Sequence, residues 1–171
     1  MKVLVIQNRM GIGDLIIFLP YIFSISKEYN TSVSLLVREN TRARELLKNN
    51  PCVSEIIILD RDDKKKAGRH QGIVGVLNLI QDLRKKNFTK SFIFNSSARY
   101  ALISKLAGIK ERYQYPLFEK KKQNIIETAK KFISLHLNKI VESNPILNID
   151  ENKVLEIKKN TNLIKNTAIF F

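Results

Sequence analysis

The chain has 171 residues, of which 44% are hydrophobic, and its formal net charge at pH 7 is +14. This length fits one domain or two small ones, and the hydrophobic content supports a sizeable core, which argues against a disordered chain. A disulfide within the chain is excluded because Cys52 is its only cysteine. The most apolar run, residues 15–25, is far shorter than the roughly 20 residues of a membrane span, contains Pro20 and follows no basic leader. We therefore expect neither a membrane span nor a signal peptide.

The basic charge predicts an anionic partner, which can be nucleic acid, a membrane surface or an anionic substrate. The excess is mostly lysine rather than arginine, and aromatic residues lie inside apolar runs such as residues 16–19 and 91–94. Aromatic side chains in such runs favour a core position over stacking on bases. Biased residue usage is an alternative explanation, so the charge alone does not decide between these partners.

Short runs of β-branched and other apolar residues alternate along the chain with segments whose apolar residues recur at helical spacing. The expected strands are residues 2–6, 32–37, 55–59, 90–94 and 111–115. The expected helices are residues 14–29, 41–48, 74–85 and 98–106, the last of them ended by Gly108. Strands and helices that alternate in units of this length imply parallel crossover connections. The sequence therefore predicts an α/β fold with a Rossmann-like, doubly wound parallel sheet.

The last part of the chain is expected to be helical and then to enter a second domain. A long lysine-rich amphipathic helix is predicted for residues 120–141, and a shorter one for residues 151–159. Residues 166–171 form an apolar run with the composition of a β-strand. We therefore expect a Rossmann-like domain over residues 1–143, followed over residues 144–171 by a linker and the truncated first strand of a missing domain.

The segment most informative for chemistry joins the first strand to the first helix. Gly11 and Gly13 lie in the connecting loop, and Asp14 opens the helix. Ligands of open parallel sheets bind beyond the carboxyl ends of the strands, glycines allow close approach to the backbone, and helix N-termini favour anions. The loop lacks the third glycine of a dinucleotide fingerprint and the Gly-Lys-Ser/Thr of a P-loop. From the residues alone, Asp14 is either a helix cap or a catalytic base.

A longer series of short motifs resembles the sequences of a known enzyme family. The series consists of the opening strand, Gly13-Asp14-Leu15, Leu19-Pro20, and residues 36–38, 50–57, 82–88, 94–99 and 106–115. In this order the motifs cover most of residues 1–115 and resemble glycosyltransferase family 9, the ADP-heptose:lipopolysaccharide heptosyltransferases. The resemblance implies the GT-B fold, which has two Rossmann-like domains. It makes this chain the N-terminal, acceptor-binding half with a C-terminal helical extension, and the missing domain the donor-binding one.

The resemblance also implies a reaction and a site. In this family the aspartate of the Gly-Asp pair is the proposed general base, and here it corresponds to Asp14. It would take the proton of the acceptor hydroxyl while that oxygen attacks the anomeric carbon of a nucleotide sugar, with inversion. The implied acceptor is an anionic, Kdo-containing glycolipid, and the transferred sugar is a heptose or a related sugar. The expected acceptor-binding residues are Gly13, Arg61, Lys64, Asn95, Ser96 and Arg99.

Each of these polar residues has a plainer alternative role. Residues 61–69 can form a solvated charged loop, and the polar residues of 95–99 can act as helix caps and a surface cation. His70 and His136 lack the partner spacing of metal or triad chemistry, so we expect a solvated and a helix-surface histidine. No metal and no cofactor are expected, in line with the metal-independent chemistry of the family.

Two departures from the family pattern limit these expectations. Arg9, Met10 and Gly11 stand where many heptosyltransferases have small hydroxyl residues, so the exact acceptor stays open. The family's nucleotide-binding groups lie in the C-terminal domain, so we expect this half to be inactive alone. The expected location is the cytoplasm, with peripheral contact to the inner membrane surface and no nucleic-acid partner. The alternative function is a non-enzymatic basic α/β module whose helix over residues 120–139 binds anionic lipid or nucleic acid.

Overall fold

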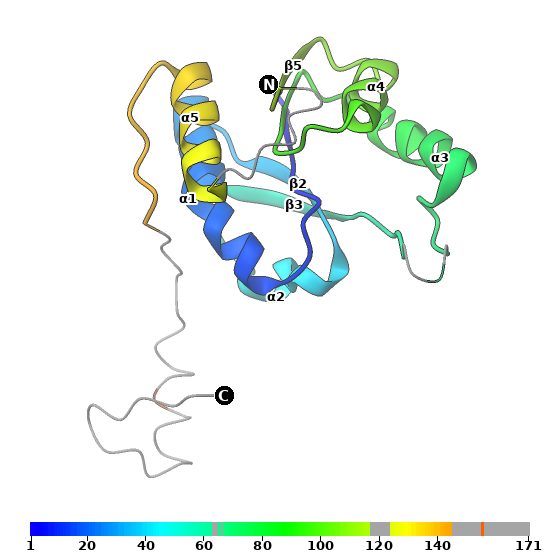
Figure 1. The fold of residues 1–171 in the computed structure, drawn as a ribbon, viewed down its shortest axis with the longest axis horizontal. Coiled ribbons are helices and arrows are strands. Elements are labelled where there is room, and N and C mark those ends of the chain that lie inside the picture. Colours follow the sequence, from blue (N-terminus) through cyan, green and yellow to red (C-terminus); the bar gives the residue numbers. More distant parts are fainter. Residues whose placement is uncertain (63–64, 66, 117–123, 145–154, 156–171) are drawn as a thin grey trace.

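The computed structural model describes residues 1–62, 65, 67–116, 124–144 and 155 of the chain (Figure 1). Within these residues, five strands form one parallel sheet in the order β3-β2-β1-β4-β5. The strands are β1 Val3–Ile6, β2 Val33–Val37, β3 Val53–Ile58, β4 Lys90–Ile93 and β5 Glu111–Gln114. The helices are α1 Ile12–Glu28, the 3₁₀ helix η1 Glu39–Thr41, α2 Ala43–Leu46, α3 Gly72–Arg84, α4 Ala98–Leu106 and α5 Ile125–Leu137. The prediction of an α/β, Rossmann-like parallel sheet is confirmed.

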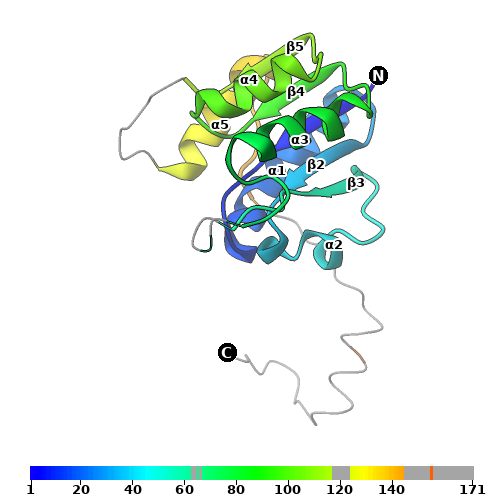
Figure 2. The same ribbon diagram turned by 90° about the vertical axis from the view of Figure 1, so that its right-hand side faces the viewer.

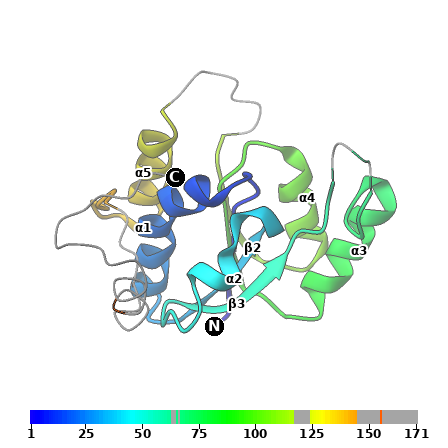
Figure 3. The same ribbon diagram turned by 90° about the horizontal axis from the view of Figure 1, so that it is seen from below.

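The central strand β1 divides its side chains between two apolar layers. Val3 and Val5 belong to the layer that includes α1 and α5, and Leu4 and Ile6 belong to the layer that includes α3 and α4. Figures 1 and 3 show these two helix pairs on opposite sides of the sheet, and Figure 2 looks onto the α3 and α4 side. Both faces of β1 are therefore covered, which explains why its sequence is a continuous apolar run rather than an alternating one.

The first two helices differ from the prediction at their ends. Helix α1 begins at Ile12 because Gly11, with a φ of 106° and a ψ of 157°, serves as its N-cap. Such a backbone conformation is essentially restricted to glycine. Asp14 consequently lies within the first turn of α1 and does not cap it. The helix expected over residues 41–48 is reduced to the single turn of α2, which follows η1.

Helix α4 has the predicted bounds and stops where the sequence indicated. Gly108 has a φ of 86°, and its N–H donates to the carbonyl of Lys105 at 3.0 Å. The next residue, Ile109, donates its N–H to the carbonyl of Ser104 at 3.1 Å. These two bonds form a Schellman motif, which satisfies carbonyls that the end of a helix leaves without partners.

Helix α5 packs beside α1, and its apolar face belongs to the core (Figures 1 and 3). The buried residues of that face are Ala129, Phe132, Ile133 and Leu137. Lys130 and Lys131 are exposed to solvent. The predicted amphipathic helix is thus confirmed in its central part, and it uses its apolar face inside the fold.

The end of the chain leaves several predictions open. Apart from Leu155, the helix expected over residues 151–159 lies outside the described residues, as does the apolar run over residues 166–171. The division of the chain at residue 143 therefore stays a prediction. Among the described residues, no helix is long and apolar enough to cross a membrane.

Candidate functional site

The strand order places a ligand-binding crevice at the carboxyl end of β1 and β4. The chain winds outward from β1 in one direction through β2 and β3, and in the other direction through β4 and β5. Open α/β sheets bind ligands at the carboxyl edge of such a switch point. Here the loop after β1 and the loop after β4 are joined by a hydrogen bond of 2.9 Å from Asn95 Nδ2 to Asn8 Oδ1. The predicted residues of both loops therefore meet at one edge.

Asp14 has the position and the availability that a general base needs. It lies half-buried in the first turn of α1, directly after the loop that leaves β1. Gly11 is the N-cap, and no side chain caps this helix. Within the described part of the chain, the Asp14 carboxylate makes no hydrogen bond and no ion pair. The sequence left two roles open for Asp14, helix cap or catalytic base. The structure excludes the cap, because Gly11 is the N-cap.

Gly13 is exposed at the start of α1, and its surroundings are open. A Cβ atom added to it would meet no atom within 4 Å. Packing within this chain therefore does not require glycine at this position. A ligand that approaches the start of α1 could contact the backbone there.

A cavity of about 570 Å³ opens beside this loop at the carboxyl ends of β2 and β3. Its lining includes Met10, Arg38, Asn40, Asp60, Arg61 and Asp62. Met10 connects the cavity to the glycine loop, and Arg61 comes from the predicted basic loop. The volume is in the range of small-molecule sites.

Arg61 is anchored by its neighbours at the rim of this cavity. Its Nε donates to Gln71 Oε1 at 3.0 Å, and its backbone carbonyl accepts a hydrogen bond of 2.6 Å from Arg38 Nη1. Asp62 and Ala67 form an isolated antiparallel bridge that closes the loop. Lys64, the second cation predicted here, lies outside the described residues. The solvated loop considered as an alternative is therefore wrong for Arg61, which is half-buried and hydrogen-bonded.

The polar residues after β4 differ in whether their side chains form hydrogen bonds within the fold. Asn95 Oδ1 accepts the N–H of Ser97 at 2.7 Å, and the Asn95 carbonyl accepts a bond of 2.7 Å from Gln114 Nε2. The cap of α4 is Ser97, whose Oγ accepts the N–H of Arg99. Ser96 is half-buried, and its side chain makes no hydrogen bond within the described residues. Capping thus involves the residues on either side of Ser96.

Arg99 connects this region to the loop before α3. Its Nη2 donates to the backbone carbonyl of His70 at 2.9 Å. Arg99 is therefore not a plain surface cation. It holds the start of α4 against the end of the basic loop.

His70 is the main residue that sequence reasoning misjudged. It is 4% exposed, whereas a solvated histidine was expected. Its Nδ1 accepts the backbone N–H of Asp60 at 3.0 Å, so Nε2 carries the proton and donates to Asp82 Oδ2 at 3.2 Å. Arg69 binds the same carboxylate through Nε at 3.1 Å and Nη2 at 2.8 Å. These hydrogen bonds, chiefly those from Arg69, lower the pKa of Asp82 to about 2.

His136 lies on α5, half-buried against the rings of Tyr113 and Phe132. Burial lowers its pKa from the ordinary value. Within the described residues, no group of three His, Cys, Asp or Glu side chains could hold a metal ion.

Neither a protein-family model nor a curated protein sequence matches this chain. Solved structures do match it. A glycosyl transferase family 9 protein from Veillonella parvula aligns with a TM-score of 0.70 and 16% identity, over 95% of this chain and 50% of that one. The ADP-heptose LPS heptosyltransferase II of E. coli aligns with a TM-score of 0.65 and 18% identity, over 96% and 51%. An E. coli heptosyltransferase with ADP-2-deoxy-2-fluoro heptose aligns with a TM-score of 0.55 and 15% identity, over 94% of this chain and 55% of that one.

The chain therefore spans about half the length of the solved structures that it matches. The fold that the sequence resemblance implies is confirmed for that half. By its architecture, this protein has the Rossmann-like half-fold of family 9 glycosyltransferase and heptosyltransferase structures.

Proposed function

We propose that this chain is the acceptor-binding half of an inverting glycosyltransferase that transfers a heptose or a related sugar from a nucleotide sugar to a lipopolysaccharide-type acceptor. Two independent arguments support this function. The ordered motif series resembles family 9, and the fold is shared with solved members of that family and with heptosyltransferases. The observation that carries the proposal is the unpaired Asp14 carboxylate at the switch point of the sheet.

In the proposed reaction, Asp14 is the general base. Its carboxylate takes the proton of the acceptor hydroxyl as the hydroxyl oxygen forms a bond to the anomeric carbon of the donor. The bond between that carbon and the nucleotide phosphate breaks on the opposite face, which inverts the anomeric centre. A base in this role must reach the hydroxyl proton without competing partners. Its position at the start of α1, with no hydrogen bond to the rest of the described chain, meets that requirement.

The acceptor would lie across the carboxyl edge and meet cations at both ends. Arg61 reaches the cavity from the loop after β3, and Arg99 and Ser96 lie after β4. Three carboxylates, those of Glu39, Asp60 and Asp62, also line the cavity. Two of them already bind backbone N–H groups of their own loop: Asp60 Oδ2 accepts from Arg69, and Asp62 Oδ1 from Lys65. Guanidinium groups bind carboxylates and phosphates well, which suits an anionic glycolipid. Lys64, Asn95 and Gly13 complete the proposed acceptor site.

Donor binding is assigned to a part of the enzyme outside this chain. The chain spans about half of the matching structures, so we expect it to bind the acceptor but not to transfer sugar by itself. A cytoplasmic enzyme that touches the inner membrane surface would reach both a soluble nucleotide sugar and a lipid acceptor. Neither a metal nor a cofactor has a role in the proposed step.

The first test measures acceptor binding by the 171-residue chain. A deacylated Kdo-containing lipid should bind saturably in a calorimetric titration, and Arg61→Gln should weaken binding by about tenfold through loss of charge-assisted hydrogen bonds. The matched control is Arg44→Gln, which removes an exposed arginine from α2 and should leave binding unchanged. Circular dichroism would verify the fold of each variant. Absence of binding, or equal losses for both variants, contradicts the acceptor site.

The second test measures transfer by the complete reading frame that contains these residues. With ADP-heptose and the deacylated lipid, mass spectrometry should detect the glycosylated product. Asp14→Asn should lower kcat by about 10²–10⁴-fold, the usual contribution of a general base, while acceptor affinity stays within about threefold because the shape is kept. A variant with wild-type kcat would remove Asp14 from the mechanism.

The alternative function, a module that docks on anionic lipid or nucleic acid through the lysine-rich helix, gains no support from α5. Such docking needs an apolar face that can enter a membrane interface. In α5 that face is packed against the core. We therefore retain only the glycosyltransferase proposal.

A further inference from the structure

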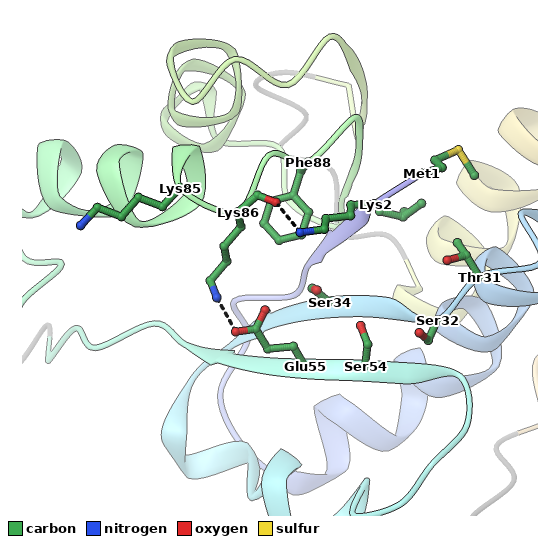
Figure 4. A pocket seen from close by; sticks show the side chains of 11 residues that line it. Met1, Lys2, Thr31, Ser32, Ser34, Ser54, Glu55, Lys85, Lys86 and Phe88 are labelled. Carbon is green, nitrogen blue, oxygen red and sulfur yellow. Dashed lines mark hydrogen bonds and ion pairs between the residues drawn. The ribbon is translucent and has the colours of Figure 1, made fainter.

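A second cavity lies at the opposite, amino-terminal edge of the sheet (Figure 4). Its volume is about 530 Å³, which again suits a small molecule. The lining residues that matter here are Lys2, Ser34, Ser54, Glu55, Lys86 and Phe88. They come from the starts of β1, β2 and β3 and from the turn after α3. None of them belongs to the proposed acceptor site.

A β-bulge directs two consecutive residues of β3 toward this cavity. Val33 pairs with Val53, but the next residue, Ser34, pairs with Glu55, so Ser54 is an extra residue in β3. In a regular strand, neighbouring side chains point to opposite faces, and a bulge changes that direction. Ser54 and Glu55 both line the cavity and rise from β3 on the same side in Figure 4. The Ser54 hydroxyl donates to the carbonyl of Val33 at 3.2 Å, so it is available to a ligand as an acceptor.

Ser34 contributes a hydroxyl that is open to the cavity. The residue is 8% exposed, and its hydroxyl points into the cavity in Figure 4. Within the described residues it makes no hydrogen bond. Ser34 shares its sheet face with Leu4 and Leu36, which are buried in the apolar layer. The hydroxyl is thus a polar group at the wall of the cavity that can donate to a ligand and accept from it.

Two ammonium groups, those of Lys2 and Lys86, line one side of the cavity. Lys86 Nζ forms an ion pair with the Glu55 carboxylate, and Lys2 Nζ donates to the carbonyl of Lys86 at 3.2 Å. Each ammonium has three N–H donors, so both keep donors for a ligand. Lys85 also lines the cavity, but its side chain points away in Figure 4. The ionised side chains that face the cavity in Figure 4 are thus those of Lys2, Lys86 and Glu55, and this excess of positive charge favours an anion that also carries hydroxyl groups.

We propose that this cavity binds a small phosphorylated polyol, such as a sugar phosphate. Lys2 and Lys86 bind the phosphate group, while Ser34, Ser54 and the Glu55 carboxylate hydrogen-bond to the hydroxyl groups of the ligand. A neutral sugar leaves the ammonium groups without an anion, and inorganic phosphate leaves the serine and glutamate side chains without hydroxyl partners. The site is separated by the length of the strands from Asp14, so it operates independently of the proposed acceptor site.

The test is an NMR titration of the ¹⁵N-labelled 171-residue chain with glucose 6-phosphate, glucose and inorganic phosphate in separate experiments. Glucose 6-phosphate should give saturable shifts at the amides of residues 31–34, 54–55 and 85–88. We expect it to bind at least about tenfold more tightly than glucose or inorganic phosphate. Equal affinity for glucose overturns the phosphate assignment, and equal affinity for inorganic phosphate overturns the polyol assignment. No shifts at concentrations that saturate millimolar sites overturn the proposal as a whole.

Variants locate the binding to this cavity. Lys2→Gln should weaken glucose 6-phosphate binding by about tenfold, and Ser34→Ala by a smaller factor of about threefold. Lys85→Gln is the matched control, because it removes a neighbouring lysine that points away, and Lys131→Gln removes an exposed lysine of α5 as a second control. Both controls should bind as the wild type does. A loss in the controls that equals the loss in Lys2→Gln assigns the binding to general charge and overturns the site.

Discussion

The loop after β1 and the loop after β3 leave the same edge of the sheet, but they differ in the extent to which their polar groups form hydrogen bonds within the folded chain. In the first loop, residues 7–13, the following Asp14 carboxylate has no partner in the described chain, and the start of α1 is open around Gly13. In the second loop, residues 60–71, several of the described polar groups bind one another. Asp60, Arg69 and His70 are joined through hydrogen bonds that also include Asp82 of α3.

This difference separates residues that can do chemistry from residues that hold a loop in place. A group that is already hydrogen-bonded in the folded chain must lose that bond before it binds a ligand, whereas an unpaired carboxylate need not. The glycines show the same contrast. A Cβ on Gly13 would meet nothing within 4 Å, but a Cβ on Gly75 would lie 2.1 Å from the carbonyl carbon of His70. The end of the β3–α3 loop, residues 67–71, is therefore packed as a support, and the β1–α1 loop is open for a ligand.

Among the variants that test this comparison, Gly75→Ala should lower the free energy of unfolding most. The added methyl group would overlap the backbone of His70, which has no flexible end that can move aside. Overpacking of a buried site costs about 1–3 kcal/mol, and a contact with backbone should place this variant at about 3 kcal/mol. Urea unfolding monitored by circular dichroism would measure the change in the free energy of unfolding. A midpoint equal to that of the wild type would show that α3 shifts easily, and the end of the loop would then not be a packed support.

The sequence predicted these two loops unequally, and the reason is physical. The β1–α1 segment carries its information locally, since an apolar strand, glycines and an acidic helix start are recognisable within twelve residues. The parallel direction of the strands followed from the same alternation of periods, whereas their order in the sheet is known from the structure. The network of the second loop depends on contacts between Asp60, His70 and Asp82, whose spacing matches no helical or strand period. Only the tertiary fold brings these groups together, so His70 was taken for a solvated residue.

The cavity at the amino-terminal edge of the sheet was even harder to predict from the sequence than the β3–α3 loop. The bulge adds one residue, Ser54, to a strand whose other pairs are regular, and neither glycine nor proline marks it. The cap of α4 could have been found, since Ser97 immediately precedes the predicted helix and serine is a preferred N-cap. The bond between Asn95 and Asn8 could not, because it joins two loops that are far apart in the sequence.

A smaller effect, with a defined pH dependence, is expected for Asp82→Asn. The folded pKa of Asp82 is about 2, below the value of about 3.9 in an unfolded chain. Its carboxylate therefore stabilises the fold above about pH 4, and this contribution is lost as the pH falls toward 2. In the variant, an amide NH₂ must face N–H donors of Arg69 or His70. We expect a lower Tm at pH 7 and a difference from wild type that shrinks between pH 4 and 2.

Thermal unfolding over that pH range would measure this dependence, with Glu45→Gln as the control. Glu45 pairs with Arg42 on the surface, and both side chains are more than half exposed. An exposed pair of this kind contributes about 0–1 kcal/mol, so the control should change little at any pH. A difference between Asp82→Asn and wild type that is constant from pH 7 to pH 2 would contradict the carboxylate's role in holding the loop.

Gly13→Ala should have the smallest effect on the fold and the opposite sign from Gly75→Ala. Alanine is better than glycine within a helix by up to about 1 kcal/mol, and the space around Gly13 is open, so the variant should be slightly more stable. If an acceptor lies against the start of α1, the same methyl group occupies part of the ligand's space, and the affinity for the deacylated Kdo-containing lipid should fall while stability rises. Urea unfolding and calorimetric titration of one protein sample would measure both quantities. A variant that gains stability and keeps full affinity would place the acceptor away from Gly13, because only a ligand can make glycine necessary where the chain itself leaves room for a side chain.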